Sequence, residues 1–133
     1  MTDPPARPAG PPLNETVLVT GGAGYIGLQT VRLLRRSGLS VVAQDRRPGP
    51  PVAELLGAVF ERVEVRDIAS MTRVLGARAI TAVVHCAGRK SAPESLRAPG
   101  DYFDDNVTGT LSLLQAMVAA SVSRLVFNSS CAV

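Results

Sequence analysis

Short, continuous apolar runs alternate with segments of helical periodicity along most of this chain of 133 residues. Runs rich in valine, isoleucine and leucine predict strands that are buried on both faces. The predicted strands are residues 16–20, 40–45, 58–65, 80–88 and 124–130, and the predicted helices are about 25–38, 51–57, 71–78 and 101–121. Strands that alternate with helices indicate an α/β protein with a parallel sheet covered on both faces. Right-handed crossovers then favour a doubly wound sheet with strand order 3-2-1-4-5.

Two of the predicted helices carry more detailed signals. Arg35 and Arg36 suit the negative C-terminal end of the first helix, and Gly38 is a natural left-handed stop. The last helix follows a predicted loop that contains Pro93, Pro99 and Gly100. We expect the apolar face of that helix to lie on the sheet. This face consists of Phe103, Val107, Thr110, Leu111, Leu114 and Val118.

The first 14 residues, MTDPPARPAGPPLN, differ in composition from the rest of the chain. They hold five of the ten prolines and show no periodicity. A segment of this kind predicts a disordered leader. The folded domain is therefore expected to span residues 15–133.

Composition excludes several classes of function. The 14 basic and 11 acidic side chains form no basic stripe, and only 4% of residues are aromatic, so nucleic-acid binding is not expected. No apolar run approaches the ~20 residues of a membrane-spanning helix, and no secretory signal precedes the domain, which argues for a cytoplasmic protein. With one histidine and no CxxC pair, a zinc site lacks ligands. Cys86 and Cys131 are interpreted as small buried thiols.

The strongest functional signal is the segment TGGAGYIG at residues 20–27. It contains a GxGxxG motif, and Gly21, Gly24 and Gly27 also fit a looser three-glycine pattern. The motif directly follows a predicted strand and opens a predicted helix, which is the context that dinucleotide binding requires. Glycines there allow a sharp turn, close approach of backbone N–H groups to a pyrophosphate, and tight packing of the helix on the strand. The alternative is a purely structural strand-to-helix turn.

Asp45, at the end of the second predicted strand, is the second signal. A carboxylate at this position accepts hydrogen bonds from the adenosine ribose hydroxyls and repels a 2′-phosphate, which favours NAD over NADP. Arg46 and Arg47 follow at once and could instead welcome that phosphate. The alternative for Asp45 is a solvated carboxylate at a strand end.

Three other polar residues stand out by position. His85 lies in an apolar strand, where a histidine is usually part of the core or the wall of a cofactor site. Lys90, the only lysine of the chain, lies on the loop after the fourth strand, at the sheet edge where ligands bind. Asn106 is expected on the sheet-facing side of the long helix, either as a structural brace or in contact with a cofactor.

Several segments together resemble one family. VLVTGGAGYIG, RDI, HCAGRKSAPES, DNVTGTLSLLQAM and RLVFNSSCAV are similar to the front of extended short-chain dehydrogenase/reductases, and among these to the UDP-glucose (UDP-galactose) 4-epimerases. The likeness covers about residues 16–133. The glycine motif is shared across the superfamily, whereas the loop after the fourth strand and the segment that follows it are more particular to the epimerases. The resemblance implies a Rossmann-type sheet, truncated here after the fifth strand, and NAD as a bound cofactor.

The resemblance also assigns cofactor contacts by position. Tyr25 and Ile26 would lie against the pyrophosphate, and Asp45 would hold the adenosine ribose. Asp67 and Ile68 would flank the adenine. The other cofactor residues that the resemblance implies are Gly21, Gly24, Gly27, Cys86, Ala87, Gly88, Arg89, Lys90, Asn106 and Ser130, with Lys90 on a phosphate or ribose oxygen and Asn106 at the nicotinamide end.

The activity that the resemblance implies is the interconversion of UDP-glucose and UDP-galactose through a 4-keto intermediate, which belongs to galactose metabolism. Ser130 matches the family's catalytic serine, which hydrogen-bonds the substrate hydroxyl beside a tyrosine. The family's Tyr-x-x-x-Lys pair does not occur in this sequence, so we expect the chain by itself not to epimerise.

Several interpretations stay open at this point. The chain is the N-terminal part of a UDP-sugar 4-epimerase, or of a related nucleotide-sugar dehydratase or decarboxylase. Alternatively, it is an NAD-binding module or a truncated remnant without catalysis. In a complete form the expected substrate is a UDP-sugar, and the helix at 101–121 is a candidate for pairing two copies into a homodimer.

Overall fold

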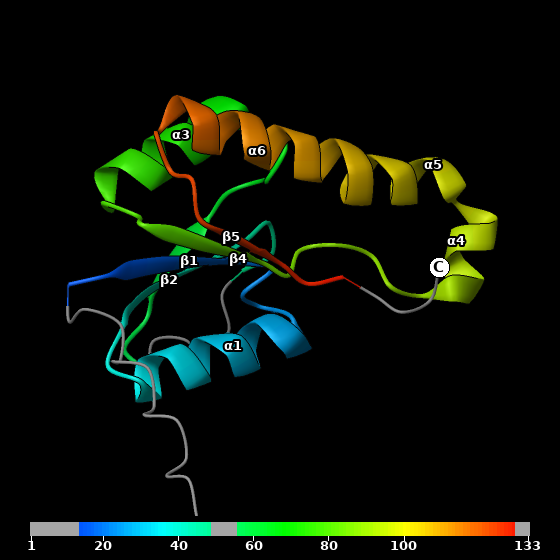
Figure 1. Ribbon diagram of the computed structural model, residues 1–133. Helices are drawn as coiled ribbons and strands as arrows, with labels where there is room; N and C mark the ends of the chain where they lie inside the picture. Colours follow the sequence, from blue (N-terminus) through cyan, green and yellow to red (C-terminus); the bar gives the residue numbers. More distant parts are fainter. Residues whose placement is uncertain (1–13, 49–55, 130–133) are drawn as a thin grey trace, which may run out of the picture.

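A five-stranded parallel sheet forms the centre of the computed structural model, which describes residues 14–48 and 56–129. The strand order is β3-β2-β1-β4-β5, as the sequence predicts (Figure 1). Every neighbouring pair runs parallel. The strands are β1 (Thr16–Thr20), β2 (Ser40–Asp45), β3 (Val59–Arg62), β4 (Ala82–His85) and β5 (Leu125–Phe127).

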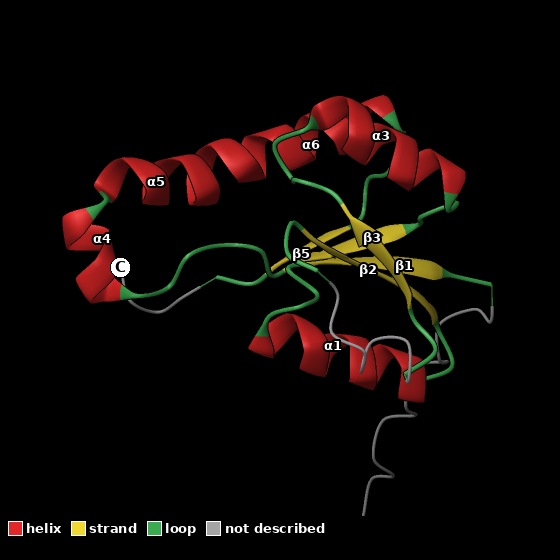
Figure 2. Ribbon diagram, turned by 180° about the vertical axis from the view of Figure 1, so that it is seen from behind, coloured by secondary structure: helices red, strands yellow, loops and turns green. Residues whose placement is uncertain are grey.

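Helices cover both faces of this sheet. Helix α1 (Tyr25–Arg36) lies on one face, and α3 (Ile68–Ala77) and α6 (Gly109–Ala119) lie together on the other (Figures 1 and 2). Each face has its own apolar cluster, with Leu18 and Val83 turned toward α3 and α6 and Val19 turned toward α1. Because successive strand side chains point to opposite faces, β1 and β2 need apolar residues at nearly every position. The α/β, doubly wound architecture is thus confirmed.

The element boundaries follow local chemistry. Gly38, just after α1, has φ +83°, so it is the left-handed stop that the sequence predicts. Helix α3 begins at Ile68, three residues before the predicted start, because the Asp67 carboxylate accepts a hydrogen bond from the Ser70 N–H and caps the helix. The third strand is shorter than predicted and ends at Arg62.

The prediction of a loop around residues 93–100 is wrong, because two short helices occupy this segment. Helix α4 spans Ala92–Arg97 and α5 spans Pro99–Phe103. Each proline lies in the first turn of its helix, where a missing N–H costs no hydrogen bond. Proline thus marks the starts of helices here.

The long predicted helix exists, but the prediction of its sheet-facing side is wrong for all of the face except Thr110. A π-helical turn, η1 (Asp104–Thr108), joins α5 to α6 and shifts the register of the side chains. Val118 is 80% exposed, and Phe103, Val107, Leu111 and Leu114 are exposed as well. Of the predicted face, Thr110 alone is half-buried, and it meets His85 of β4. The side chains that pack on the sheet are Leu113, Ala116 and Met117. Because α6 is apolar on two sides, periodicity could not select the buried one.

Several sequence-based predictions lie outside the described residues. These are the leader, except for Asn14, nearly all of the helix predicted at 51–57, and the positions of Ser130 and Cys131. Within the described part of the chain, no helix is both long and apolar enough to cross a membrane.

Candidate functional site

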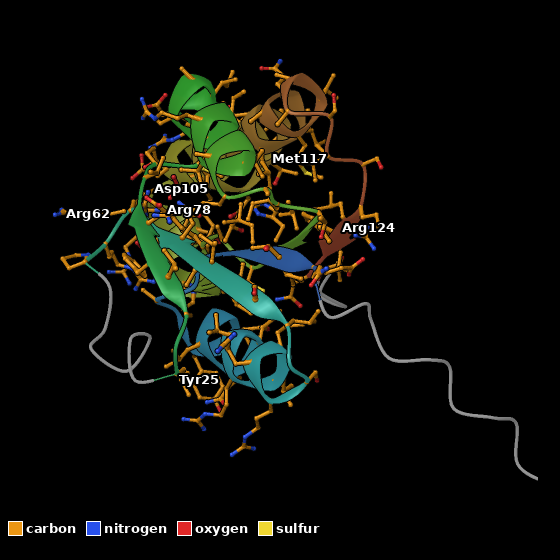
Figure 3. The ribbon with its side chains drawn as sticks, turned by 90° about the vertical axis from the view of Figure 1, so that its left-hand side faces the viewer. Tyr25, Arg62, Arg78, Asp105, Met117 and Arg124 are labelled. Carbon is orange, nitrogen blue, oxygen red and sulfur yellow. The ribbon has the colours of Figure 1, made fainter. Side chains whose placement is uncertain are left out.

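A cavity of about 670 Å³ opens at the carboxyl ends of the strands. The glycine loop after β1 forms one wall, the last residues of β2 form the floor, and the loop after β4 forms the opposite wall. Figure 3 shows Asp105 on the α6 side of the sheet and Tyr25 on the α1 side, and both line this cavity. The cavity therefore lies at the topological switch point between β1 and β4, where the strand order reverses and where doubly wound folds bind ligands.

The glycine loop is shaped by close backbone contacts. Gly21 has φ +66°, and a Cβ there would lie 2.8 Å from the backbone of Ala87. A Cβ on Gly27 would lie 2.7 Å from the carbonyl carbon of Gly21 and closer still to its oxygen. Because Gly21 has no Cβ, the loop can turn beside the residues that follow β4. Because Gly27 has no Cβ, α1 can start directly on the loop. Both positions therefore require glycine.

Helix α1 presents an uncapped N-terminus to the cavity. Its N-cap is Gly24, no side chain caps it, and no acidic residue lies in its first turn. Gly24, Tyr25 and Ile26 line the cavity. The free N–H groups of a first turn and the helix dipole favour an anion such as a phosphate. By contrast, the first turn of α3 is capped by the Asp67 carboxylate, which accepts from the Ser70 N–H.

The Asp45 carboxylate lies beside this N-terminus and is almost fully buried. One oxygen accepts from the Ala23 N–H at 3.2 Å and from Arg47 Nη2 at 3.0 Å. The other accepts from the Arg47 N–H at 3.0 Å and Arg47 Nε at 3.1 Å. Burial alone would raise the pKa of Asp45, but these hydrogen bonds and the Arg47 charge outweigh it and hold the pKa below its usual value. Asp45 is therefore ionised at neutral pH.

A group of ion pairs borders the cavity on the α6 side. The Asp105 carboxylate contacts Arg89 at 2.6 Å, Arg46 at 3.1 Å and Arg66 at 3.7 Å. Although burial acts to raise the pKa of Asp105, the hydrogen bonds from Arg89 and Arg46 lower it overall. These arginines come from three different strand-end loops, so Asp105 ties the loops together. The π-helical turn delivers Asp105 to this position, and sequence reasoning did not find it.

His85 is a neutral, buried link between two strands and the helix layer. The Thr20 hydroxyl accepts from the N–H groups of Cys86 and Ala87, so its own hydrogen donates to His85 Nδ1 at 2.6 Å. His85 Nε2 then carries the ring hydrogen and donates to the Thr110 hydroxyl at 3.0 Å. Burial lowers the pKa of His85 to about 4. This agrees with the interpretation of His85 as a core residue.

Asn106 braces the loop that follows β4. Its Oδ1 accepts from the Arg89 N–H at 2.8 Å, and its Nδ2 donates to the Arg89 carbonyl at 3.1 Å. Both functional atoms of the amide are therefore engaged with backbone. Of the two roles that the sequence left open, the structure shows the brace.

Most of the predicted cofactor residues line the cavity. They are Gly21, Gly24, Tyr25, Ile26, Gly27, Asp45, Cys86, Ala87, Gly88, Arg89 and Lys90. Asp67, Ile68 and Asn106 are not part of its lining, and Ser130 lies outside the described residues. The lining residues that the predicted set missed are Gln44, Arg46, Arg47, Glu64, Val65, Glu94, Asp105 and Gly109. Strand-end position could have signalled Gln44 and Glu64, since each is the next-to-last residue of a predicted strand.

Gln44 has one feature that bears on a ligand. Its side chain is buried, and its Nε2 donates to the Val63 carbonyl. This contact fixes the amide orientation, because a carbonyl must face a donor. Gln44 Oε1 has no hydrogen-bond partner among the described residues. A buried acceptor without a donor in a cavity wall fits a site that is completed by a bound molecule or water.

Comparisons with known proteins identify the family. Residues 17–133 match the model of the NAD dependent epimerase/dehydratase family. The chain belongs to this family. The match covers β1 through β5 and every element that surrounds the cavity, so the resemblance seen in the sequence motifs is confirmed.

Individual relatives of the family are UDP-glucose 4-epimerases. The chain is 46% identical over 125 residues to the UDP-glucose 4-epimerase of Klebsiella pneumoniae. The alignment covers 88% of this chain and 90% of that protein. It is 41% identical to the enzyme of Bos taurus, over 90% of this chain and 38% of that protein. Among solved structures, it is similar to the UDP-glucose 4-epimerase of Stenotrophomonas maltophila with bound NAD and formylated UDP-arabinopyranose. That structure has a TM-score of 0.83 and 39% identity, and the alignment covers 89% of this chain and 38% of that one.

The chain thus spans less than two fifths of the bovine and Stenotrophomonas family members. The matched part of the Stenotrophomonas protein has the same architecture as this chain. The predicted cofactor, NAD, is confirmed at the level of the family by its NAD dependence and by the NAD in that neighbour.

Proposed function

We propose that this chain is the NAD-binding, N-terminal part of a UDP-glucose 4-epimerase that interconverts UDP-glucose and UDP-galactose. One observation carries the proposal: an uncapped helix N-terminus and an ionised, buried carboxylate, Asp45, face the same cavity at the switch point of the sheet. In a dinucleotide, the pyrophosphate would bind the helix N-terminus and a ribose diol would bind the carboxylate. The relatives named above support the choice of reaction.

The residues present fit NAD. The first-turn N–H groups of α1, at Tyr25 and Ile26, would hold the pyrophosphate, with Gly24 leaving room for it. Asp45 would accept the adenosine ribose hydroxyls. The loop from Cys86 to Lys90 would form the opposite wall, with the Lys90 ammonium available to a phosphate or ribose oxygen. Contacts of Asp67, Ile68 and Asn106 with the cofactor remain part of this proposal.

NAD, when bound, supplies hydride transfer at the sugar, and the protein's task is to position reactants and to exchange protons. We assign Ser130 to the hydrogen bond with the reacting hydroxyl. The proposal carries with it a role in galactose metabolism, a cytoplasmic location and a UDP-sugar as substrate.

A chimeric enzyme tests the proposed function. Residues 15–133 replace the corresponding segment of the Stenotrophomonas maltophila UDP-glucose 4-epimerase, and conversion of UDP-galactose to UDP-glucose is measured. We expect the chimera to be active. Ser130→Ala should lower kcat about 100-fold or more, because one proton-handling contact in the transition state is lost.

The control for this variant is Ser123→Ala, since Ser123 is exposed just before β5 and should leave kcat unchanged. NAD content and the circular dichroism spectrum of each chimera separate loss of chemistry from loss of folding. A folded, NAD-containing chimera without turnover would refute the assignment as an epimerase segment.

We also propose that the exposed side of α6 pairs with a second copy of the chain. Leu111, Leu114 and Val118 line a shallow apolar groove there with Gln115 and Ala119. Exposed apolar side chains that lie together on one helix face are a candidate for contact with another protein. In sedimentation equilibrium, we expect a dimer, and Val118→Glu should shift it to monomer.

The matched control for the dimer prediction is Leu96→Glu on α4. Leu96 is 86% exposed but lies outside the groove, so its replacement should leave the dimer intact. If both variants and the unmodified chain sediment as monomers at micromolar concentration, pairing through α6 is refuted.

A further inference from the structure

Arg47 donates hydrogen bonds to the Asp45 carboxylate, which is the acceptor that a ribose diol needs. Its backbone N–H and Nε bind one oxygen of Asp45, and its Nη2 binds the other at 3.0 Å. The remaining donor to this carboxylate is the Ala23 N–H. Asp45 can accept ribose hydroxyls only after the Arg47 side chain has moved. The guanidinium is free to do so, because the Arg47 side chain is 61% exposed.

The same guanidinium also lies over the glycine loop. Arg47 Nη2 lies 3.5 Å from the position that a Cβ on Gly24 would take. It is therefore placed between the Asp45 carboxylate and the uncapped N-terminus of α1, where the ribose and the pyrophosphate of a dinucleotide meet. A cation at this position neutralises the carboxylate that would otherwise repel a 2′-phosphate.

We infer that Arg47 makes this cavity accept a 2′-phosphorylated dinucleotide, NADP, beside NAD. This inference rests on the proposed function and extends its cofactor range. From the observed position, Arg47 would donate to a 2′-phosphate through its remaining guanidinium N–H groups without leaving the carboxylate. For NAD it must first leave, so the same contact that favours NADP acts against NAD. Arg47 is thus a specificity-determining residue with opposite effects on the two cofactors.

Arg46, which directly follows Asp45 and also lines the cavity, serves as the matched comparison for the ratio of the two Kd values. Its guanidinium pairs with Asp105 at 3.1 Å and lies 3.9 Å from Glu64. It is engaged on the α6 side of the cavity and makes no described contact with Asp45. Replacing Arg46 removes one positive charge from the same neighbourhood, but it leaves the Asp45–Arg47 pair in place.

The experiment measures Kd for NAD and for NADP by calorimetry on the 133-residue chain, its Arg47→Gln variant and its Arg46→Gln variant. For the unmodified chain, we expect the two Kd values to lie within about tenfold of each other. In Arg47→Gln, NADP should bind about 10- to 100-fold more weakly, the size expected for lost charge-assisted hydrogen bonds. NAD should bind more tightly in that variant. In Arg46→Gln, the ratio of the two Kd values should change by less than about threefold.

The outcomes separate the two proposals. If a folded chain binds neither dinucleotide, the proposed function fails. If NAD binds while NADP is excluded by the unmodified chain, or if Arg47→Gln weakens NAD, the inference fails and Arg47 is a simple pyrophosphate contact. Arg47→Lys offers a further variant, which keeps the charge but loses the fork that binds both Asp45 oxygens. Its ratio of the two Kd values should fall between that of the unmodified chain and that of Arg47→Gln.

Discussion

Replacing Gly27 with alanine is expected to unfold the glycine loop and to abolish NAD binding. The new Cβ would lie 2.7 Å from the carbonyl carbon of Gly21 and nearer to its oxygen. Both atoms are backbone, so no side chain can rotate to relieve the clash, and α1 must move away from β1. We expect a loss of about 3 kcal/mol in the free energy of unfolding, at the upper end for overpacked cores. Urea denaturation followed by circular dichroism measures it.

Gly76→Ala provides the matched control for the Gly27 variant. Gly76 lies inside α3, and a Cβ there would meet nothing within 4 Å. Because alanine is a better helix former, this variant should gain up to about 1 kcal/mol. If Gly27→Ala and Gly76→Ala have similar stabilities, the account of the glycine loop is wrong.

Stability is expected to fall as the pH drops from about 6.5 to about 4 because of His85. The pKa of His85 is lowered to about 4 in the folded chain, against a usual value of 6.5 in the unfolded chain. Between these values the unfolded state binds more protons, so stability rises with pH over this range. The contribution is complete above pH 6.5 and is lost by about pH 4. A difference of 2.5 pKa units corresponds to about 3 kcal/mol.

The chain contains one histidine, so His85→Gln removes the whole imidazole titration. Free energies of unfolding are measured from pH 7 to pH 4 for both proteins. The carboxylates titrate in both and cancel in the difference, which isolates His85. We expect the variant to be less stable at pH 7 and the gap to close by about 3 kcal/mol toward pH 4. A gap that stays constant with pH would show that His85 is not held neutral by the fold.

The sheet could be predicted from the sequence because its strands are buried on both faces. Val17, Leu18 and Val19 are all buried, and a buried parallel strand needs such a run. The glycine motif and Asp45 could be predicted because the motif directly follows the first strand and Asp45 is the last residue of the second. Once strand order is known, their meeting at one edge follows from the topology.

Other parts of the site depend on geometry that no local pattern encodes. The π-helical turn rotates Asp105 and Asn106 toward Arg89, and a regular helix would have placed them differently. The ion pairs of Asp105 join loops that are far apart in the chain, so spacing could not reveal them. Arg47 was visible only as one of two basic residues, and its contact with both oxygens of Asp45 needed the structure.

The most direct test of the central claim is a titration of NAD into the 15N-labelled chain, followed by NMR. The account predicts that amide resonances change at residues 21–27 and 86–90, which form the two walls of the cavity. The amides of Gly76 and Val118, on the outer helices, should stay unchanged. Spectra of a folded chain that do not change with NAD, or changes confined to other parts of the chain, would contradict an NAD site in this cavity.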